Sequence, residues 1–142
     1  MPNVLTLDLS THTGWCVGDD VPTWGVWHLA SFAKHRGSML AGLRNALCDA
    51  IEQHQPSKVV IEQRAPAFSF QRGSSANSSD QQTYLESVVY LSGQDESVPV
   101  VEVSARSVRS RMILSGSKIT TKSKNDGAIV RWCNAQGYTV FD

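Results

Sequence analysis

Two carboxylates stand at the ends of apolar segments that have the composition of β-strands. Asp8 ends the segment 4–8, and Glu62 ends the segment 58–62. In α/β sheets, ligands bind beyond the carboxyl ends of the strands, and neighbouring strands lie about 5 Å apart. Two carboxylates so close together repel unless one stays protonated or both share a cation. If the two strands are neighbours in the sheet, we therefore predict that Asp8 and Glu62 share a divalent metal ion.

Each carboxylate also has a simpler interpretation. Asp8 could only begin a turn, because residues 10–14 are mostly turn formers. The apolar residues around it instead favour a strand covered on both faces, in which an unpaired charge would be costly. Glu62 could face solvent at the start of a loop and pair with Arg64.

A polar loop is expected over residues 64–79, and it contains two aromatic side chains. Phe68 and Phe70 stand between Arg64 and Arg72, ahead of a run rich in Ser and Asn. The two rings could cover the hydrophobic core, or they could stack on nucleic-acid bases beside the arginines. The second alternative makes Phe68, Phe70 and Arg72 candidate DNA-binding residues.

A basic segment lies near the end of the chain, although the net charge of the whole chain is zero. More than half of the 13 Lys and Arg residues fall within residues 104–131, which contain one acid, Asp126. Lys122 and Lys124 lie in a Ser/Thr-rich loop whose free backbone N–H groups could hold phosphates. A solvated face without a ligand is the alternative.

The elements that must position these residues follow from hydrophobic periodicity. Segments 4–9, 14–17 and 23–29 predict three antiparallel strands with short connections. Residues 39–53 carry an apolar stripe typical of a helix, and 58–62 reads as a buried strand parallel to the first. A helix beginning at Ser79 or Asp80 and stopped by Gly93 should precede a strand over 98–103, followed by further helices.

The length and composition indicate one soluble domain spanning residues 1–142. Neither a membrane-spanning run nor a signal peptide is recognisable, so a cytoplasmic location and no membrane partner are expected. The three cysteines are scattered without a CxxC pair or a His at zinc-ligand spacing, which favours reduced structural thiols.

The order of these elements resembles the ribonuclease H-like fold, and three motifs resemble the RuvC family of Holliday junction resolvases, especially its short phage-type members. The motifs are LDLSTHTGW at 7–15, VVIEQ at 59–63 and PVVEV at 99–103. The resemblance covers nearly the whole chain. It implies an α/β fold, with a five-stranded mixed sheet of three antiparallel and then two parallel strands and helices on both faces.

The resemblance also implies roles for single residues. Asp8 and Glu62 match the family's metal-binding catalytic acids, for two Mg²⁺ ions with Mn²⁺ as a substitute. An aromatic residue beyond the Glu stacks on a base of the junction, which fits Phe68 or Phe70, and loop lysines contact phosphates, which fits Lys122 or Lys124. Many family members have Gly where this chain has Ser10. In that family a C-terminal helix carries one or two further catalytic acids, and we expect this chain to stop at Asp142 before that helix. With Asp8 and Glu62 alone, weak metal binding and little or no cleavage are expected.

These observations together predict a Mg²⁺-dependent endodeoxyribonuclease that resolves Holliday junctions or other branched DNA, acts as a homodimer and works in a host cytoplasm if it is phage-encoded. One alternative is a non-catalytic module that binds branched DNA. Another is an ATPase domain of the actin and sugar-kinase type, because residues 8–14 also resemble the first phosphate loop of those proteins. Nucleotide titration would identify the ATPase.

Overall fold

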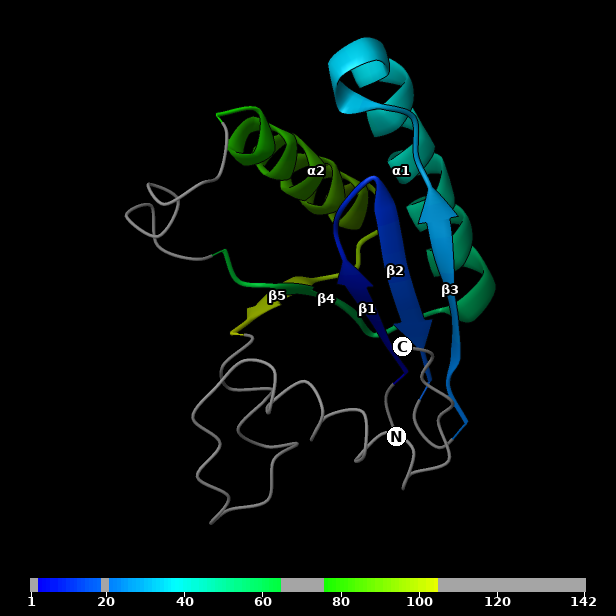
Figure 1. The fold of residues 1–142 in the computed structure, drawn as a ribbon. Coiled ribbons are helices and arrows are strands. Elements are labelled where there is room, and N and C mark those ends of the chain that lie inside the picture. The colour runs from blue at the N-terminus through cyan, green and yellow to red at the C-terminus, as the bar shows by residue number, and fades with distance from the viewer. Residues whose placement is uncertain (1–2, 19–20, 65–75, 105–142) are drawn as a thin grey trace, which may run out of the picture. The chain divides into compact units, whose positions relative to one another are not determined.

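The computed structural model describes residues 3–18, 21–64 and 76–104 (Figure 1). The chain divides into two compact units, Met1–Glu102 and Val103–Asp142. Nearly everything described here belongs to the first unit. A single domain over the whole chain stays a prediction.

A five-stranded mixed sheet forms the first layer, with strand order β3-β2-β1-β4-β5. Strand β1 pairs antiparallel with β2 and parallel with β4, and β2 pairs antiparallel with β3. The predicted ribonuclease H-like sheet is confirmed. The strands are β1 (Val4–Asp8), β2 (His12–Val17), β3 (Thr23–His28), β4 (Lys58–Glu62) and β5 (Val100–Val103).

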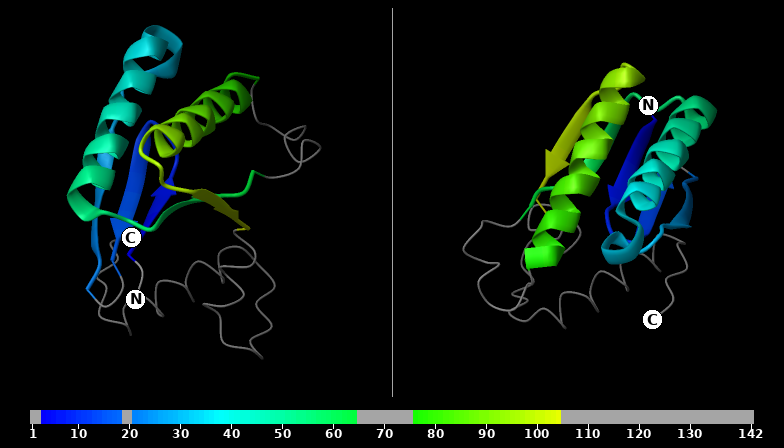
Figure 2. Two further views of the ribbon diagram at one scale, coloured as in Figure 1. Left: turned by 180° about the vertical axis from the view of Figure 1, so that it is seen from behind. Right: turned by 90° about the horizontal axis from the view of Figure 1, so that it is seen from above.

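Two helices, α1 (Phe32–His54) and α2 (Ala76–Asp95), pack side by side on one face of this sheet (Figure 2). The opposite face, which we call the open face, carries no helix from the described part of the chain. Helices expected after Ser104 lie outside the described residues. Neither α1 nor α2 is long and apolar enough to cross a membrane.

Strand β1 buries alternate side chains, as a strand with one covered face does. Leu5 and Leu7 are buried under the helices, whereas Thr6 and Asp8 are exposed on the open face. The prediction that this strand is covered on both faces is therefore wrong for Thr6 and Asp8. The error arose because Val4, Leu5, Leu7 and Leu9 make the segment almost continuously apolar, which hides the alternation.

Helix α1 begins seven residues before its predicted start at Met39. Ser31 is its N-cap residue, and the side chain of Phe32 is buried in the core. His35 has non-helical dihedral angles (φ −139°, ψ 55°), so the first turn is offset from the rest of the helix. A kink interrupts the apolar period, which explains why the periodicity located only the later part.

Gly93 lies inside α2, which continues to Asp95, so the predicted stop at Gly93 is wrong. The reason for a glycine here is a close approach of the chain that enters β5. A Cβ at position 93 would lie 2.8 Å from the carbonyl oxygen of Val98 and 2.7 Å from Cγ2 of Val100. The Gly93 carbonyl also accepts a 2.8 Å hydrogen bond from the Val98 N–H.

Replacing Gly93 with Ala should lower the free energy of unfolding by about 1–3 kcal/mol, because the added methyl group meets backbone atoms that must move. Gly37→Ala is the matched control in α1, where a Cβ meets nothing within 4 Å. That change should raise stability by up to about 1 kcal/mol through helix propensity. Urea unfolding followed by circular dichroism measures both. Equal effects of the two substitutions would contradict the close approach at Gly93.

Candidate metal centre

The register of the parallel strands places Asp8 beside Glu62. Leu7 pairs with Ile61 across β1 and β4, so the next residues in each strand, Asp8 and Glu62, are neighbours. The two strands lie about 4.8 Å apart. Leu7 and Ile61 point into the core, and therefore the side chains of Asp8 and Glu62 point to the open face.

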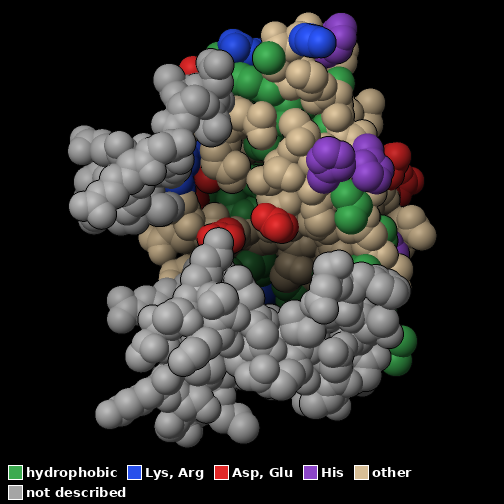
Figure 3. Space-filling model, in the orientation of Figure 1, with side chains coloured by type: hydrophobic (Ala, Val, Ile, Leu, Met, Phe, Trp, Pro, Cys, Tyr) green, Lys and Arg blue, Asp and Glu red, His purple; other side chains and the backbone are tan. Residues whose placement is uncertain are grey.

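Both carboxylates are exposed to solvent. Figure 3 shows acidic side chains next to each other near the middle of the open face, with histidine side chains gathered on the same face. Because both side chains are exposed, the pair does not carry the burial cost that the sequence suggested. Each carboxylate is therefore accessible to an ion from solvent.

Side-chain hydrogen bonds hold the turn that follows Asp8. The buried Thr13 hydroxyl donates to the Ser10 carbonyl (2.7 Å) and accepts from the Ser10 N–H (3.4 Å). The Ser10 hydroxyl donates to the His12 carbonyl (2.9 Å) and accepts from the His12 N–H (3.0 Å). Because both its backbone and its hydroxyl are hydrogen-bonded within the turn, Ser10 stabilises the end of β1 that carries Asp8.

Gly14 is the cross-strand partner of Asp8. A Cβ added at Gly14 would lie 3.7 Å from the Asp8 Cβ, which is an ordinary contact. Any longer side chain at this position would stand beside the carboxylate on the open face. The glycine therefore leaves room on one side of Asp8, while Glu62 occupies the other.

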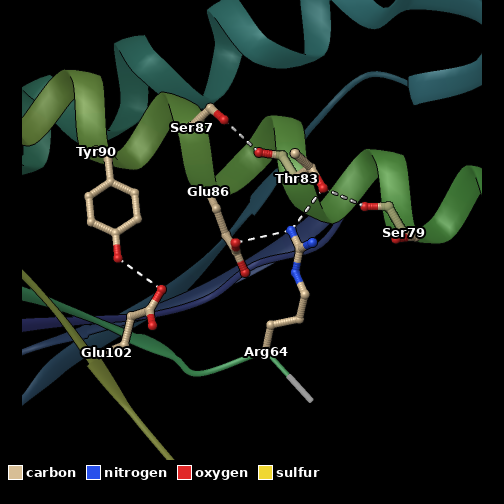
Figure 4. Close-up of polar contacts among 7 residues, drawn as sticks. All are labelled: Arg64, Ser79, Thr83, Glu86, Ser87, Tyr90 and Glu102. Atoms are coloured by element: carbon tan, nitrogen blue, oxygen red, sulfur yellow. Dashed lines mark hydrogen bonds and ion pairs between the residues drawn. The ribbon is translucent and has the colours of Figure 1, made fainter. Parts of the chain in front are cut away.

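An ion pair fastens the end of β4 to α2 (Figure 4). The Nη2 group of Arg64 donates to Glu86 Oε2 (3.0 Å) and to the Thr83 hydroxyl (2.9 Å). The Glu86 side chain is 14% exposed and that of Arg64 is 30% exposed. Within the described residues Arg64 forms no ion pair with Glu62, so that alternative is wrong, although Glu62 does face solvent.

The Arg64–Glu86 pair is joined at one point only. Arg64 Nε and Glu86 Oε1 are both buried and have no hydrogen-bond partner among the described residues. The Thr83 hydroxyl donates onward to the Ser79 carbonyl (3.0 Å), which continues the contact along α2. The residue two positions after Glu62 is thereby tied to two successive turns of the helix.

No third ligand joins the carboxylates within the described ranges, where no group of three or more His, Cys, Asp or Glu side chains could hold a metal ion. Glu102 in β5 instead accepts a 2.8 Å hydrogen bond from the Tyr90 hydroxyl, and this bond raises the pKa of Tyr90. Cys16 and Cys48 are free thiols, and burial raises the pKa of each. Neither thiol is therefore primed as a thiolate ligand.

The structure does not describe the predicted DNA-binding residues Phe68, Phe70, Arg72, Lys122 and Lys124. Their roles stay predictions. Sequence reasoning missed the partner of Arg64, which lies 22 residues away, and it missed the pairing of His12 with His28. Only the fold brings these residues together.

Sequence comparison finds no relative: no protein-family model matches the chain, and no curated protein matches it significantly. Comparison of structures finds close similarity of fold. RuvC of T. thermophilus in complex with a Holliday junction substrate superposes with a TM-score of 0.68 at 14% identity, over 93% of this chain and 79% of RuvC.

Two further solved structures agree. A second Thermus thermophilus RuvC structure gives a TM-score of 0.64 at 15% identity, over 99% of this chain and 83% of RuvC. The yeast mitochondrial Holliday junction resolvase Ydc2 superposes with a TM-score of 0.59 at 16% identity, over 98% of this chain and 64% of Ydc2. At these identities the similarity is one of fold, the ribonuclease H-like fold of RuvC.

Proposed function

We propose that this chain, which has the fold of RuvC resolvases, is a divalent-metal-dependent endonuclease that cuts branched DNA, with the four-way Holliday junction as its substrate. The observation that carries the proposal is the placement of Asp8 and Glu62 at neighbouring positions of two parallel strands, both facing outward. Similarity to resolvases such as RuvC and Ydc2 supports this substrate class. A bacteriophage origin and a cytoplasmic location belong to the same proposal.

The two carboxylates fit a Mg²⁺ ion. Mg²⁺ prefers oxygen ligands, keeps several waters and is commonly bound by one or two carboxylates. Arg64 is engaged by Glu86, so it does not neutralise the pair. A bound Mg²⁺, or Mn²⁺ in its place, would supply an activated water and stabilise the leaving oxygen of a phosphodiester.

The residues of the chain would have distinct tasks in this reaction. Asp8 and Glu62 hold the ion, and the absence of a side chain at Gly14 leaves space for the DNA beside Asp8. The turn built on Ser10 and Thr13 keeps the Asp8 end of β1 in place. In-line hydrolysis would leave a 5′ phosphate and a 3′ hydroxyl.

Residues outside the described ranges would bind the DNA. Phe68 or Phe70 would stack on an exposed base, and Arg72, Lys122 and Lys124 would contact phosphates. A homodimer fits a junction, because a four-way junction presents two symmetric strands and a two-fold axis repeats the same site on both. Two cuts would then resolve one junction.

Removal of the metal ion tests the proposal. The chain should nick a synthetic four-way junction in Mg²⁺ or Mn²⁺ and should not nick it in excess EDTA, as resolved on a denaturing gel. In Ca²⁺ it should still bind the junction in a mobility-shift assay. Nicking in EDTA, or equal nicking of a linear duplex of the same sequence, would contradict a metal-dependent and junction-selective nuclease.

A non-catalytic module that binds branched DNA is the second candidate. It predicts junction binding that weakens steeply with salt, without nicking in any divalent metal ion. The same gels and mobility-shift assays therefore separate the two functions.

A further inference from the structure

A pair of histidines on the open face has no part in the proposed nuclease reaction. His12 and His28 are directly opposite each other across β2 and β3. Their ring centroids are 5.0 Å apart, the ring planes are at 85°, and both side chains are exposed. Two imidazoles placed in this way on paired strands could bind one metal ion together.

The distance between the rings suits a shared metal ion. A transition-metal ion binds imidazole nitrogen at about 2.0–2.1 Å, which puts the ion about 3.2 Å from each ring centroid. The centroids of two such rings would be about 4.5 Å apart if the nitrogen–metal–nitrogen angle were a right angle, and about 5.2 Å apart if it were tetrahedral. The observed 5.0 Å lies between these values, so the two rings, which come from cross-strand partners, already have the required separation.

Hydrogen bonds hold the backbone at both histidines, and one polar contact reaches the His12 ring. The backbone N–H and carbonyl of His12 are bonded to the Ser10 hydroxyl, and the Leu29 N–H next to His28 donates to the Thr11 carbonyl (2.7 Å). The Thr11 hydroxyl lies 3.4 Å from His12 Nδ1, which leaves His12 Nε2 for a ligand. A polar partner on the second ring nitrogen is the usual companion of a metal-binding histidine.

We propose that His12 and His28 form a two-imidazole site for a borderline divalent transition-metal ion, of which Zn²⁺, Ni²⁺ and Cu²⁺ are the candidates. Imidazole favours these ions, whereas the carboxylate pair favours Mg²⁺ and Mn²⁺. Two imidazoles fill half of a tetrahedral shell, so the remaining positions stay open to water or to an anionic oxygen. His12 is diagonal to Asp8 across β1 and β2, a separation of about 7–8 Å, so the two sites are distinct.

Isothermal titration of the full chain with Ni²⁺, without DNA and in a slightly alkaline buffer free of other metal ions, tests the site. The parent should bind one ion at this site, and His12→Ala and His28→Ala should each weaken that binding at least about tenfold. Asp8→Asn should retain it, since the carboxylates are not ligands. All three changes are at exposed side chains, and circular dichroism confirms that the variants fold.

His35→Ala is the matched control, because His35 is also exposed but lies on α1, apart from the two strands that carry His12 and His28. It should leave the affinity for Ni²⁺ unchanged. Paramagnetic Ni²⁺ should also broaden the NMR signals of the His12 and His28 rings before that of the His35 ring. The proposal is overturned if His12→Ala and His28→Ala bind Ni²⁺ as the parent does, or if His35→Ala loses as much affinity as they do. This outcome does not depend on nuclease activity.

Discussion

Asp8→Asn is expected to lower Mg²⁺-dependent nicking of a four-way junction by about a hundredfold or more. Asn keeps the size of the side chain but loses the charge that would hold the proposed ion. A catalytic metal ion contributes several kcal/mol, with about 1.4 kcal/mol for each tenfold in rate. Glu62→Gln should act in the same way. Since both side chains are exposed, neither change should disturb the fold.

The stability of these variants is a second measurement. Without a metal ion, removal of one carboxylate relieves repulsion from its neighbour, so the free energy of unfolding should be unchanged or slightly higher. Asp49→Asn and Glu52→Gln, at exposed positions of α1, are the matched controls and should nick at the parent rate. If Asp8→Asn and Glu62→Gln also nick at that rate, the carboxylate pair is not the catalytic site.

The sheet and the pairing of its first and fourth strands could be predicted from the sequence. The segment Lys58–Glu62 has an apolar centre and follows Pro56, and it forms β4 with these bounds. A helix between two apolar runs implies a crossover and therefore parallel strands. Parallel strands end at the same edge of a sheet, which is why the sequence predicts that Asp8 and Glu62 lie close together if their strands are neighbours.

The rest depends on contacts between residues far apart in the chain. The exposure of Asp8 follows from which sheet face the helices cover, and the almost continuous apolar run around it does not reveal this. Glu86 lies 22 residues after Arg64 in the sequence, and no rule of sequence spacing predicts that the two side chains meet. His12 and His28 meet only through the register of β2 and β3, which metal-ligand motifs of fixed spacing do not describe.

Glu86→Gln is expected to lower the free energy of unfolding by about 1–3 kcal/mol. The substitution keeps the shape of the side chain but leaves the guanidinium of Arg64 without its counter-ion in a site that is mostly buried. Breaking a fully buried pair costs about 3–5 kcal/mol, and the partial exposure of Arg64 reduces this value. Arg64→Met, which keeps the aliphatic packing, should be destabilising by a similar amount.

A double-mutant cycle in urea unfolding isolates the pair. The double variant Arg64→Met with Glu86→Gln should be less destabilised than the sum of the single variants, with a coupling of about 1 kcal/mol or more. Arg44–Asp95 is the matched control, because it also has a 3.0 Å contact but its side chains are 61% and 54% exposed. The cycle of Arg44→Met and Asp95→Asn should give about 0–0.5 kcal/mol. Equal coupling in the two cycles would show that the Arg64–Glu86 pair is no more than a surface contact.

The position of this pair gives it a consequence for the metal centre. Arg64 follows Glu62 by two residues, so loss of the Arg64–Glu86 ion pair should let the end of β4 move. The Glu62 carboxylate should then adopt a wider range of orientations. Glu86→Gln should therefore raise the Mg²⁺ concentration needed for half-maximal nicking and leave the rate at saturating Mg²⁺ near that of the parent. Asp8→Asn should not recover at any Mg²⁺ concentration, because it removes a ligand. Recovery of nicking in high Mg²⁺ thus distinguishes a residue that positions the site from one that holds the ion. If Glu86→Gln has the same Mg²⁺ requirement as the parent, the Arg64–Glu86 pair contributes to stability alone.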